Sequence, residues 1–342
     1  MDNGARFSGY HHFRSFPSSA RVTRSLGTLA LLAGAACAGA QTAYPNKPIR
    51  LIVPLAAGSA VDNAARVLMQ KMGQDMGQSF VIENQPGASG LIGAERVAKA
   101  APDGYTLGGF NDSVLTMVPH IYPKAPWNAL TDFEPVSLVA TIEWGIAVKE
   151  DSPLRTVGDL IRAARANPGK LNFASGGNGS PQHLSMALLA SRANVVMTHV
   201  PYKGATPAAV AAGAGEVDVT FQGLGTVTSL LQAGKLRLLA VSSAKRLPQY
   251  PNVPTIAESA ELPDFYFNSW FALVAPAKTS KEVVNQLYTE VKAALDDPET
   301  RAKVIAGGAT PRAMPPAEFG KAIAQQYAMY RKLITDNNIK GE

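Results

Sequence analysis

The sequence is nearly free of cysteine, since Cys37 is the one cysteine among 342 residues. A lone cysteine cannot form an intrachain disulfide or a cysteine-ligated zinc site. Cys37 also lies in an N-terminal segment that has the features of a cleaved leader. We therefore expect a mature chain without disulfides, thiol nucleophiles or cysteine-bound metal.

The chain also lacks a hydrophobic run of membrane-spanning length. The apolar run from Leu26 to Ala38 has about 13 residues, whereas a membrane-spanning helix needs ~20. Arg14, Arg21 and Arg24 precede this run, and the small residues Ala38-Gly39-Ala40 end it. This pattern is typical of a secretory signal. We predict that residues 1–40 are a signal peptide and that cleavage before Gln41 releases an exported protein.

Two other interpretations of the leader are disfavoured. A membrane anchor would need a longer apolar run. A lipoprotein would use Cys37 as its lipidated residue, but Gly34 stands three residues earlier, where such sites usually carry an aliphatic residue.

Clustered charge is missing as well. Removal of residues 1–40 takes away four arginines and one aspartate, so the basic residues fall from 32 to 28, the acidic ones from 26 to 25, and the net charge from +6 to +3. No run of lysines and arginines remains, which excludes an electrostatic footprint for nucleic acid. A slight positive charge suits a small anionic ligand without requiring one.

What is present is an alternation of short β-branched runs with helical patterns, starting at "KPIRLIVPL" (47–55). This alternation predicts βαβ units and mostly parallel sheets. The expected strands are 49–55, 79–84, 105–110, 171–175, 195–200, 217–222 and 236–242. Expected helices include 61–76, 90–100, 156–166, 181–193 and 226–233. A further helix is expected where Val283, Leu287, Val291 and Leu295 recur every four residues, and another from about 316 to 335.

Two extended stretches, 134–150 and 263–277, contain no helical pattern. We interpret them as paired strands that cross between two lobes. Residues 41–143 together with 269–342 would then form lobe 1, and residues 144–268 would form lobe 2. The predicted fold class is α/β, with two lobes and a ligand cleft between them.

The stretch "LNFASGGNGSPQHLSMALL" (171–189) joins a predicted strand to a predicted helix through a glycine-rich loop. Ser180 followed by Pro181 predicts an N-cap and a first helical residue. Free backbone N–H groups and the positive end of the helix dipole meet there, so the loop is suited to an anion. The candidate ligand residues are Ser175, Gly176, Gly177, Asn178, Gly179, Ser180 and His183.

Nucleotide and hydrolase interpretations of this loop fit less well. Ser180-Pro181 stands where a phosphate loop needs Lys-Ser/Thr, and the dinucleotide fingerprint lacks its third glycine. No G-x-S-x-G elbow occurs for a serine nucleophile. Ser175 or Ser180 with His183 remains a rival hydrolase site, but an orienting or packed role of His183 is favoured. We expect no cofactor, and neither His120 nor His199 has the partner spacing of a metal site.

A similar unit follows the first predicted strand. The loop "AAGSA" leads into a helix, and Ser59 with Asp62 resembles a capping box, which could be a purely structural feature. Two helix N-termini that face each other across a cleft would bind a ligand with acidic or polar ends. The candidates in this loop are Leu55, Ala57, Gly58, Ser59 and Asp62.

Four more candidates lie near the ends of other predicted strands, where open parallel sheets bind ligands. Asn111 and Ser113 follow one strand, Tyr202 follows another, and Gln222 ends a third. Lys203, beside Tyr202, faces either an anion or solvent. The same positions also allow N-caps or surface residues.

Several ordered motifs resemble one known family. The segments "YPNKPIRLIVP" (44–54), "APDGYTL" (101–107), "ANPGKLNFASGGNGSPQHL" (166–184), "THVPYKG" (198–204), "AGKLRLLAVSSAKR" (233–246) and "VPTIAES" (253–259) are similar to those of the tripartite tricarboxylate transporter substrate-binding proteins, the TctC or Bug receptors. The resemblance spans essentially the whole mature chain. It implies a type II periplasmic binding protein that closes on its ligand and, in many members, delivers it to membrane permease subunits.

The resemblance also implies that loops 55–62 and 175–183 hold a carboxylate through backbone groups and ordered waters. Two departures affect the ligand. Gly58-Ser59 stands where the family usually has Gly-Gly, and Phe221-Gln222-Gly223 replaces a frequent Phe-Asp-Asn. The second change removes an acidic contact that some members use.

We therefore expect a periplasmic, non-enzymatic, monomeric receptor for a small organic anion, a mono- or dicarboxylate. Its partner would be the permease of a tripartite tricarboxylate-type transporter, or alternatively a membrane sensor protein.

Overall fold

A computed structural model describes residue 15, residues 44–259 and residues 262–336. The predicted signal peptide lies outside the described residues, apart from residue 15. None of the helices in the described part combines the length and the apolar character that crossing a membrane requires.

The strands form two sheets. One sheet has the order β11 (Ala309–Met314), β4 (Phe133–Ile142), β10 (Ser269–Pro276), β3 (Thr106–Asn111), β1 (Ile49–Val53) and β2 (Phe80–Asn84). The other has the order β7 (Thr198–Pro201), β6 (Asn172–Ser175), β8 (Val219–Gly223), β5 (Trp144–Lys149) and β9 (Leu236–Val241). We call them the first and the second sheet.

Each sheet is mixed, so the expectation of mostly parallel sheets was wrong. β1 pairs in parallel with β2 and β3, and β6 pairs in parallel with β7 and β8. The antiparallel pairs all involve β4, β5, β10 or β11. These strands are not joined to their neighbours by βαβ units, and a parallel pairing needs such a crossover.

The first sheet has helices on both faces. Its strands carry buried apolar side chains at successive positions, and these side chains point alternately to one face and to the other. Leu51 and Val53 pack with α2 (Ala60–Met76) and α9 (Lys281–Asp296), whereas Ile52 packs with α3 (Leu91–Ala98) and α11 (Pro316–Asp336). Successive residues of a strand point to opposite faces, so these apolar runs suit a sheet that is covered on both sides. Helix α10 (Pro298–Ala306) packs near α2 and α9.

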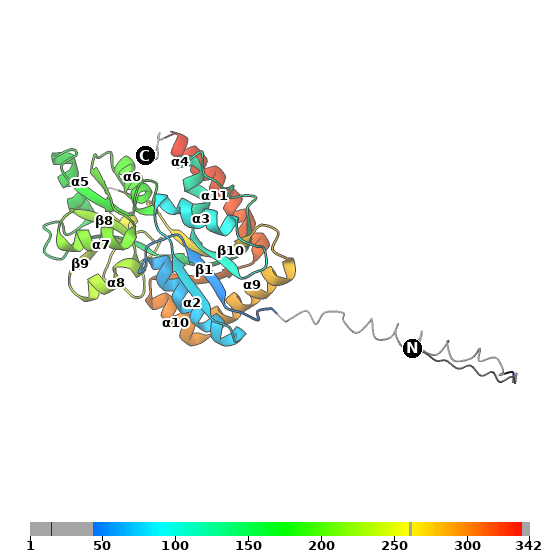
Figure 1. Cartoon of the computed structure of the whole chain (residues 1–342). Coiled ribbons are helices and arrows are strands. Elements are labelled where there is room, and N and C mark those ends of the chain that lie inside the picture. The colour runs from blue at the N-terminus through cyan, green and yellow to red at the C-terminus, as the bar shows by residue number, and fades with distance from the viewer. Residues whose placement is uncertain (1–14, 16–43, 260–261, 337–342) are drawn as a thin grey trace, which may run out of the picture. The chain divides into compact units, whose positions relative to one another are not determined.

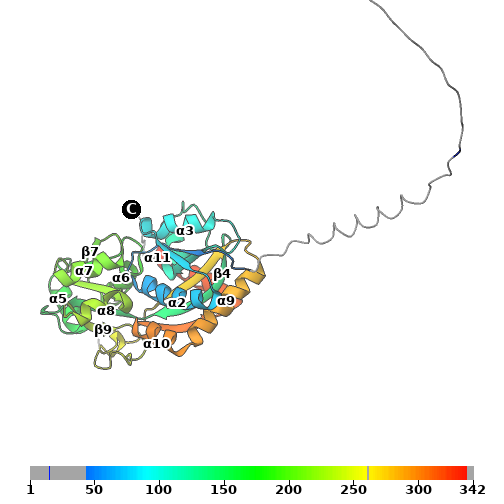
Figure 2. The same cartoon turned by 60° about the horizontal axis from the view of Figure 1, so that its bottom comes forward.

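The second sheet is covered in the same way. Ile146 belongs to the apolar cluster that includes α5 (Val157–Ala166) and α6 (Pro181–Ala193). Its neighbour Ala147 packs with α7 (Ala205–Ala214) and α8 (Leu224–Gln232). The elements from β5 to β9 lie together on the left in Figures 1 and 2, and the N-terminal and C-terminal elements share the right.

Short helical segments complete the described chain. η1 (Ala88–Gly90) precedes α3, η2 (Ser113–Met117) and α4 (Val118–Ile121) follow β3, and η3 (Ile256–Glu258) follows β9.

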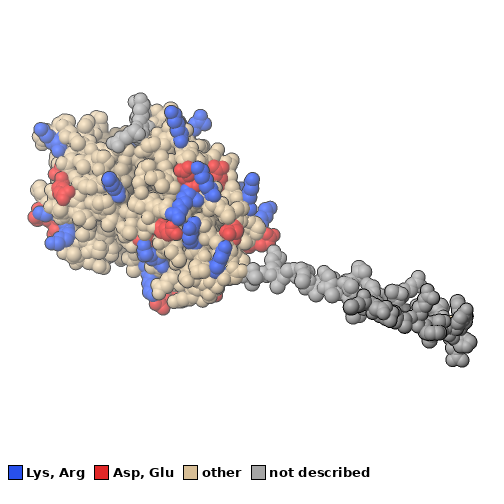
Figure 3. Space-filling view, viewed as in Figure 1, with Lys and Arg blue, Asp and Glu red and all other residues tan. Residues whose placement is uncertain are grey.

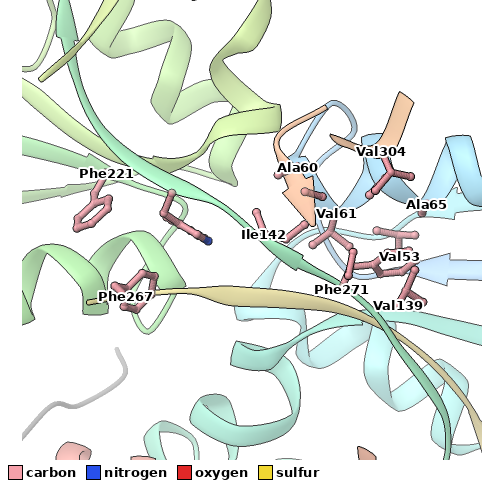
Figure 4. Packing of buried hydrophobic residues seen from close by; sticks show 14 of the residues in the cluster. Val53, Ala60, Val61, Ala65, Val139, Ile142, Phe221, Phe267, Phe271 and Val304 are labelled. Carbon is pink, nitrogen blue, oxygen red and sulfur yellow. The ribbon is translucent and has the colours of Figure 1, made fainter. Parts of the chain in front are cut away.

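Two chain segments connect the sheets. Strand β4 belongs to the first sheet and β5 to the second, with only Glu143 between them. The return passes Phe267, whose backbone N–H bonds to the carbonyl of Ser242, and enters β10, which pairs antiparallel with β4. One apolar cluster continues across this junction: Figure 4 shows Ile142 between Phe221 and Phe267 on one side and Val61 on the other.

Candidate functional site

A cavity of about 320 Å³ lies where the ends of the two sheets meet. Its wall contains residues that follow β1 and β3 of the first sheet, and residues that follow β6, β7 and β8 of the second. Its size falls in the range of small-molecule sites, about 300–1,000 Å³. The end of a strand is also where α/β sheets place their ligands.

The sequence candidates separate into two groups. Those that line the cavity are Leu55, Ser59, Asn111, Ser113, Gly176, Gly177, Asn178, Ser180 and Tyr202. Those that lie behind its wall are Ala57, Gly58, Asp62, Ser175, Gly179, His183 and Gln222. The second group acts on the site through hydrogen bonds to the first group or to the loops that carry it.

Five helices begin at the cavity, among them α3, whose N-cap residue Gly90 lines it. Ser59 caps α2 by accepting from the N–H of Asp62 at 3.3 Å, and Ser180 caps α6 by accepting from the N–H of His183 at 3.3 Å. Gly204 and Gly223, the N-cap residues of α7 and α8, also line the cavity. Helix N-termini carry partial positive charge and unsatisfied N–H groups. The wall therefore favours an anion at several points.

The glycine loop before α6 supplies further donors. Among the hydrogen bonds of the described residues, none uses the N–H of Gly176 or Asn178, and both residues line the cavity. Gly176 is needed for close approach, because a Cβ there would lie 3.1 Å from the Ala205 nitrogen at the start of α7. The absence of a side chain at Gly176 thus lets the glycine loop approach the N-terminus of α7.

Asp62 holds the loop after β1. Its carboxylate is 1% exposed and accepts from the N–H of Gly58 at 2.8 Å, from Arg66 Nε at 2.9 Å and from Asn84 Nδ2 at 2.8 Å. Asn84 Nδ2 also lies 3.2 Å from the carbonyl oxygen of Leu55. The Asp62 side chain therefore fixes the loop and does not line the cavity.

Gln222 fixes a neighbouring side chain that the sequence analysis missed. Its Nε2 donates to the Ala205 carbonyl at 3.3 Å and to Thr220 Oγ1 at 2.9 Å, so its Oε1 is left to accept from Gln182 Nε2 at 3.1 Å. Gln182 lines the cavity, one residue after the cap pair Ser180-Pro181. The helix start was recognisable from the sequence, but the direction of this side chain depends on β8.

The rival hydrolase site does not have the geometry of a catalytic triad. Ser175 Oγ lies 2.5 Å from His199 Nε2, but Ser175 is fully buried behind the wall. His183 Nδ1 accepts from the N–H of Gly179 at 3.1 Å, and Ser180 Oγ is occupied as an N-cap. In the described residues, no acidic side chain bonds to either imidazole.

The charge balance of the wall favours an anionic ligand. Among the described residues that line the cavity, Lys203 carries the only full charge at neutral pH, and its side chain is exposed. No aspartate or glutamate is among these lining residues. Elsewhere, on the face shown in Figure 3, acidic and basic side chains are interspersed.

One buried carboxyl lies behind the wall. Burial raises the pKa of Asp112 to about 7, against hydrogen bonds that favour its ionised form. Asp112 accepts from Ser269, a residue that lines the cavity. In the described residues, no group of three His, Cys, Asp or Glu side chains is arranged to hold a metal ion.

Another missed part of the wall is the loop from Pro86 to Gly90. Ala88 and Ser89 have φ values of 45° and 54°, a left-handed conformation that side chains rarely adopt. Ser89 Oγ donates to the carbonyl of Asn178 at 2.5 Å, across the cavity. The sequence "PGASG" indicates a loop, but not that it reaches a segment 89 positions away.

Other hydrogen bonds also join the two sides of the site. Ser113 Oγ donates to the Gly179 carbonyl at 3.1 Å, and Thr206 Oγ1 donates to the Ala57 carbonyl at 2.8 Å. At the base, the N–H of Ala60 donates to Thr226 Oγ1 at 2.9 Å. The walls are thus in direct contact in this conformation.

Comparison with known proteins agrees with this architecture. The model of the tripartite tricarboxylate transporter family receptor matches residues 64–339. A protein of the tcbD-tcbE intergenic region of Pseudomonas sp. (strain P51) is 42% identical over 257 residues, which are 75% of this chain and 76% of that protein.

Solved structures with the same architecture include three periplasmic or ligand-bound proteins. R. palustris Rpa4515 with adipate has a TM-score of 0.84 and 34% identity, over 87% of this chain and 100% of that one. The periplasmic binding protein BugD has a TM-score of 0.81 and 31% identity, over 87% and 100%. MatC from Rhodopseudomonas palustris with bound malate has a TM-score of 0.79 and 29% identity, over 85% and 100%.

Proposed function

Because this chain belongs to the tripartite tricarboxylate transporter receptor family, we propose that it is an exported receptor that captures a small organic carboxylate in the cavity described above. The family consists of solute-binding receptors, and the chemistry required of the site is binding rather than bond making or breaking. The proposal concerns the ligand, the residues that hold it and the partner that receives it.

The composition of the cavity wall is the observation that carries this proposal. Five helices begin at the wall, and Gly176 and Asn178, whose N–H groups have no hydrogen-bond partner among the described residues, are part of it. Among the described lining residues there is one lysine and no acidic side chain. Such a wall stabilises a carboxylate by many small dipolar contributions, each typically about 0.3–1 kcal/mol. The positive ends of these helix dipoles would repel a cationic ligand.

We assign the residues three tasks. The loops Leu55–Ser59 and Gly176–Ser180 contact the ligand oxygens through backbone N–H groups. Asp62 and His183 orient those loops and any bridging waters. Asn111, Ser113 and Tyr202 set selectivity from the wall, and Gln222 does so through Gln182.

Relatives with ligands support a carboxylate of modest size. The solved structures similar to this chain hold adipate in one case and malate in another. Both ligands are dicarboxylates, and they differ in length and in hydroxylation. In this chain Ser59 caps α2 through its hydroxyl, and Gln222 acts on the wall through Gln182, so neither position brings an acidic side chain to the ligand.

We further propose that residues 41–143 with 269–342 and residues 144–268 form two lobes that close on the ligand. The crossings at Glu143 and near Phe267 would act as hinges, and the direct contacts between Ser89 and Asn178 would lock the closed form. In the periplasm, the closed monomer would deliver its ligand to membrane permease subunits.

A thermal-shift screen of residues 41–342 tests the proposal. The panel contains aliphatic and aromatic mono- and dicarboxylates, with the corresponding amides and amines as controls. A ligand at 100 times its dissociation constant stabilises the folded chain by roughly 2.7 kcal/mol. We expect a clear shift with at least one carboxylate class and none with amines; a panel in which no acid raises the melting temperature contradicts the proposal.

A further inference from the structure

Two histidines that do not line the cavity are stacked behind its glycine loop. The imidazole rings of His183 and His199 have centroids 4.0 Å apart and planes inclined by only 5°. Phe173 extends the stack, with its ring centroid 4.9 Å from that of His199. The three residues come from α6, β7 and β6, so the stack joins the helix to the edge of the second sheet.

Each imidazole is connected to the backbone of the glycine loop. His183 Nδ1 accepts directly from the N–H of Gly179 at 3.1 Å. His199 Nε2 lies 2.5 Å from Ser175 Oγ, and that oxygen accepts from the N–H of Gly177 at 3.1 Å. Gly176 and Asn178, which alternate with Gly177 and Gly179 along the loop, line the cavity, and no hydrogen bond of the described residues uses their N–H groups.

The bond from the Gly179 N–H depends on a neutral His183 ring. A nitrogen that accepts a hydrogen bond must carry a lone pair, and both ring nitrogens of a protonated histidine are donors. Protonation of His183 would therefore place two N–H groups against each other at Gly179. The bond between His199 Nε2 and Ser175 Oγ can form with either atom as donor, because Ser175 Oγ also donates to the Gly177 carbonyl at 3.2 Å. Protonation of both rings would instead place two positive charges 4.0 Å apart in the stack.

We propose that His183 and His199 are positioning residues: as a neutral stacked pair they hold the glycine loop in its binding conformation, and uptake of a proton releases the loop and weakens ligand binding. The inference rests on the proposed function and extends it, since it makes capture of the ligand dependent on pH through groups that never touch it.

The surroundings of the pair agree with a neutral state near pH 7. Burial lowers the pKa of His183 below 6.5, and burial together with the proximity of His183 lowers that of His199 to about 4. Among the described residues, the one charged or titratable group that shifts either pKa is His183, which lowers the pKa of His199. The binding conformation is therefore fully present above pH 6.5 and is lost as the pH falls through the folded-state values.

Binding of adipate measured by calorimetry from pH 7.5 to pH 4.5 tests the inference. In the wild-type chain we expect the dissociation constant to rise by at least about tenfold over this range. Linkage of binding to the uptake of one proton changes the dissociation constant by up to about tenfold for each pH unit below the pKa. His183→Asn keeps an acceptor for the Gly179 N–H but does not titrate. Relative to its own dissociation constant at pH 7.5, this variant should lose most of the rise at low pH, and because adipate titrates equally in both experiments its own contribution cancels.

Two further variants separate positioning from general damage. His183→Ala has no acceptor, so it should bind about tenfold more weakly than the wild type at pH 7.5 and should show little further weakening as the pH falls. His120→Asn alters the third described histidine, which bonds to the Tyr327 carbonyl and does not line the cavity, so its profile should match the wild type. Equal acid sensitivity of the wild type and His183→Asn would overturn the inference, as would wild-type affinity of His183→Ala.

A measurement without ligand tests the positioning role of the histidines independently of whether the protein binds a carboxylate. In ¹H–¹⁵N NMR spectra of the mature chain, the amide signals of Gly177 and Gly179 should shift together with the titration of the two histidines, and in His183→Asn the Gly179 signal should stay still. Immobile glycine signals while the imidazoles titrate would refute the positioning role. If no carboxylate binds but the glycines respond, the proposed function fails and the coupling within the loop stands.

Discussion

At the scale of single residues, the site depends on small side chains where backbones approach each other. Gly176 shows this most clearly. Its neighbours Gly177 and Gly179 have φ values of 116° and 73°, and Gly176 itself touches the start of α7. A loop of this kind aims its N–H groups at a ligand because no Cβ stands between them.

We predict that Gly176→Ala lowers affinity for any bound carboxylate by at least about tenfold, because overpacking of this contact typically costs about 1–3 kcal/mol. The new Cβ would lie 3.1 Å from the Ala205 nitrogen and 3.2 Å from the Gly204 carbonyl carbon. Calorimetric titration with the acid identified by thermal shift measures the change.

Gly213→Ala is the matched control. Gly213 lies inside α7, and its Cβ would come no closer than 3.7 Å to Lys235, which is an ordinary contact. Alanine is favoured over glycine in a helix interior by about 0.5–1 kcal/mol, so this variant should be slightly more stable and should bind normally. Equal affinity of both variants would show that the close approach at Gly176 is not needed.

At the scale of elements, the strand–loop–helix units were largely predictable. Ser59 and Ser180 each precede an apolar helical pattern, and both are N-caps in the structure. Helix α7 was not predicted, because alanine and glycine dominate its sequence and leave no contrast between a polar and an apolar face. Strand β11 was missed for a different reason: Pro311 interrupts a short run whose only partner is β4.

The residues that join different elements were the least predictable. Ser89 and Gln182 are ordinary polar residues in their local sequence. Their importance arises from contacts with Asn178 and Gln222, which are distant in the chain. Local periodicity carries no information about such contacts, so the sequence indicated the loops after β1 and β6 but neither the loop Pro86–Gly90 nor the side chains that bridge the loops.

The loop between β1 and α2 should depend on Asp62 for its stability. We predict that Asp62→Ala lowers the free energy of unfolding by about 3 kcal/mol, because it leaves the Gly58 N–H, Arg66 and Asn84 without their common buried acceptor. Urea denaturation followed by circular dichroism measures the change.

Asp75→Ala provides the control within the same helix. Asp75 pairs with Lys71 at the surface, and exposed pairs contribute little. We expect a much smaller loss of stability than at Asp62. Comparable losses in the two variants would mean that the Asp62 network does not stabilise this loop.

At the scale of the whole molecule, two mixed β-sheets, each covered by helices, meet at a cavity and share one apolar cluster across their junction. N-terminal and C-terminal strands lie in the same sheet because the chain crosses to the second sheet at Glu143 and returns to the first sheet at β10. A small number of hydrogen bonds joins the walls of the cavity. Such an interface can open without unfolding either sheet, which is what a receptor with an enclosed ligand requires.

The central claim is that backbone N–H groups at converging helix N-termini hold a carboxylate in this cavity. A crystal structure of residues 41–342 with the acid identified by thermal shift tests it most directly. We predict a carboxylate within hydrogen-bond distance of the N–H groups of Gly176 or Asn178, or of one ordered water bonded to them, with no acidic side chain in contact. A ligand bound outside the cavity, or held by Lys203 alone, would contradict the account.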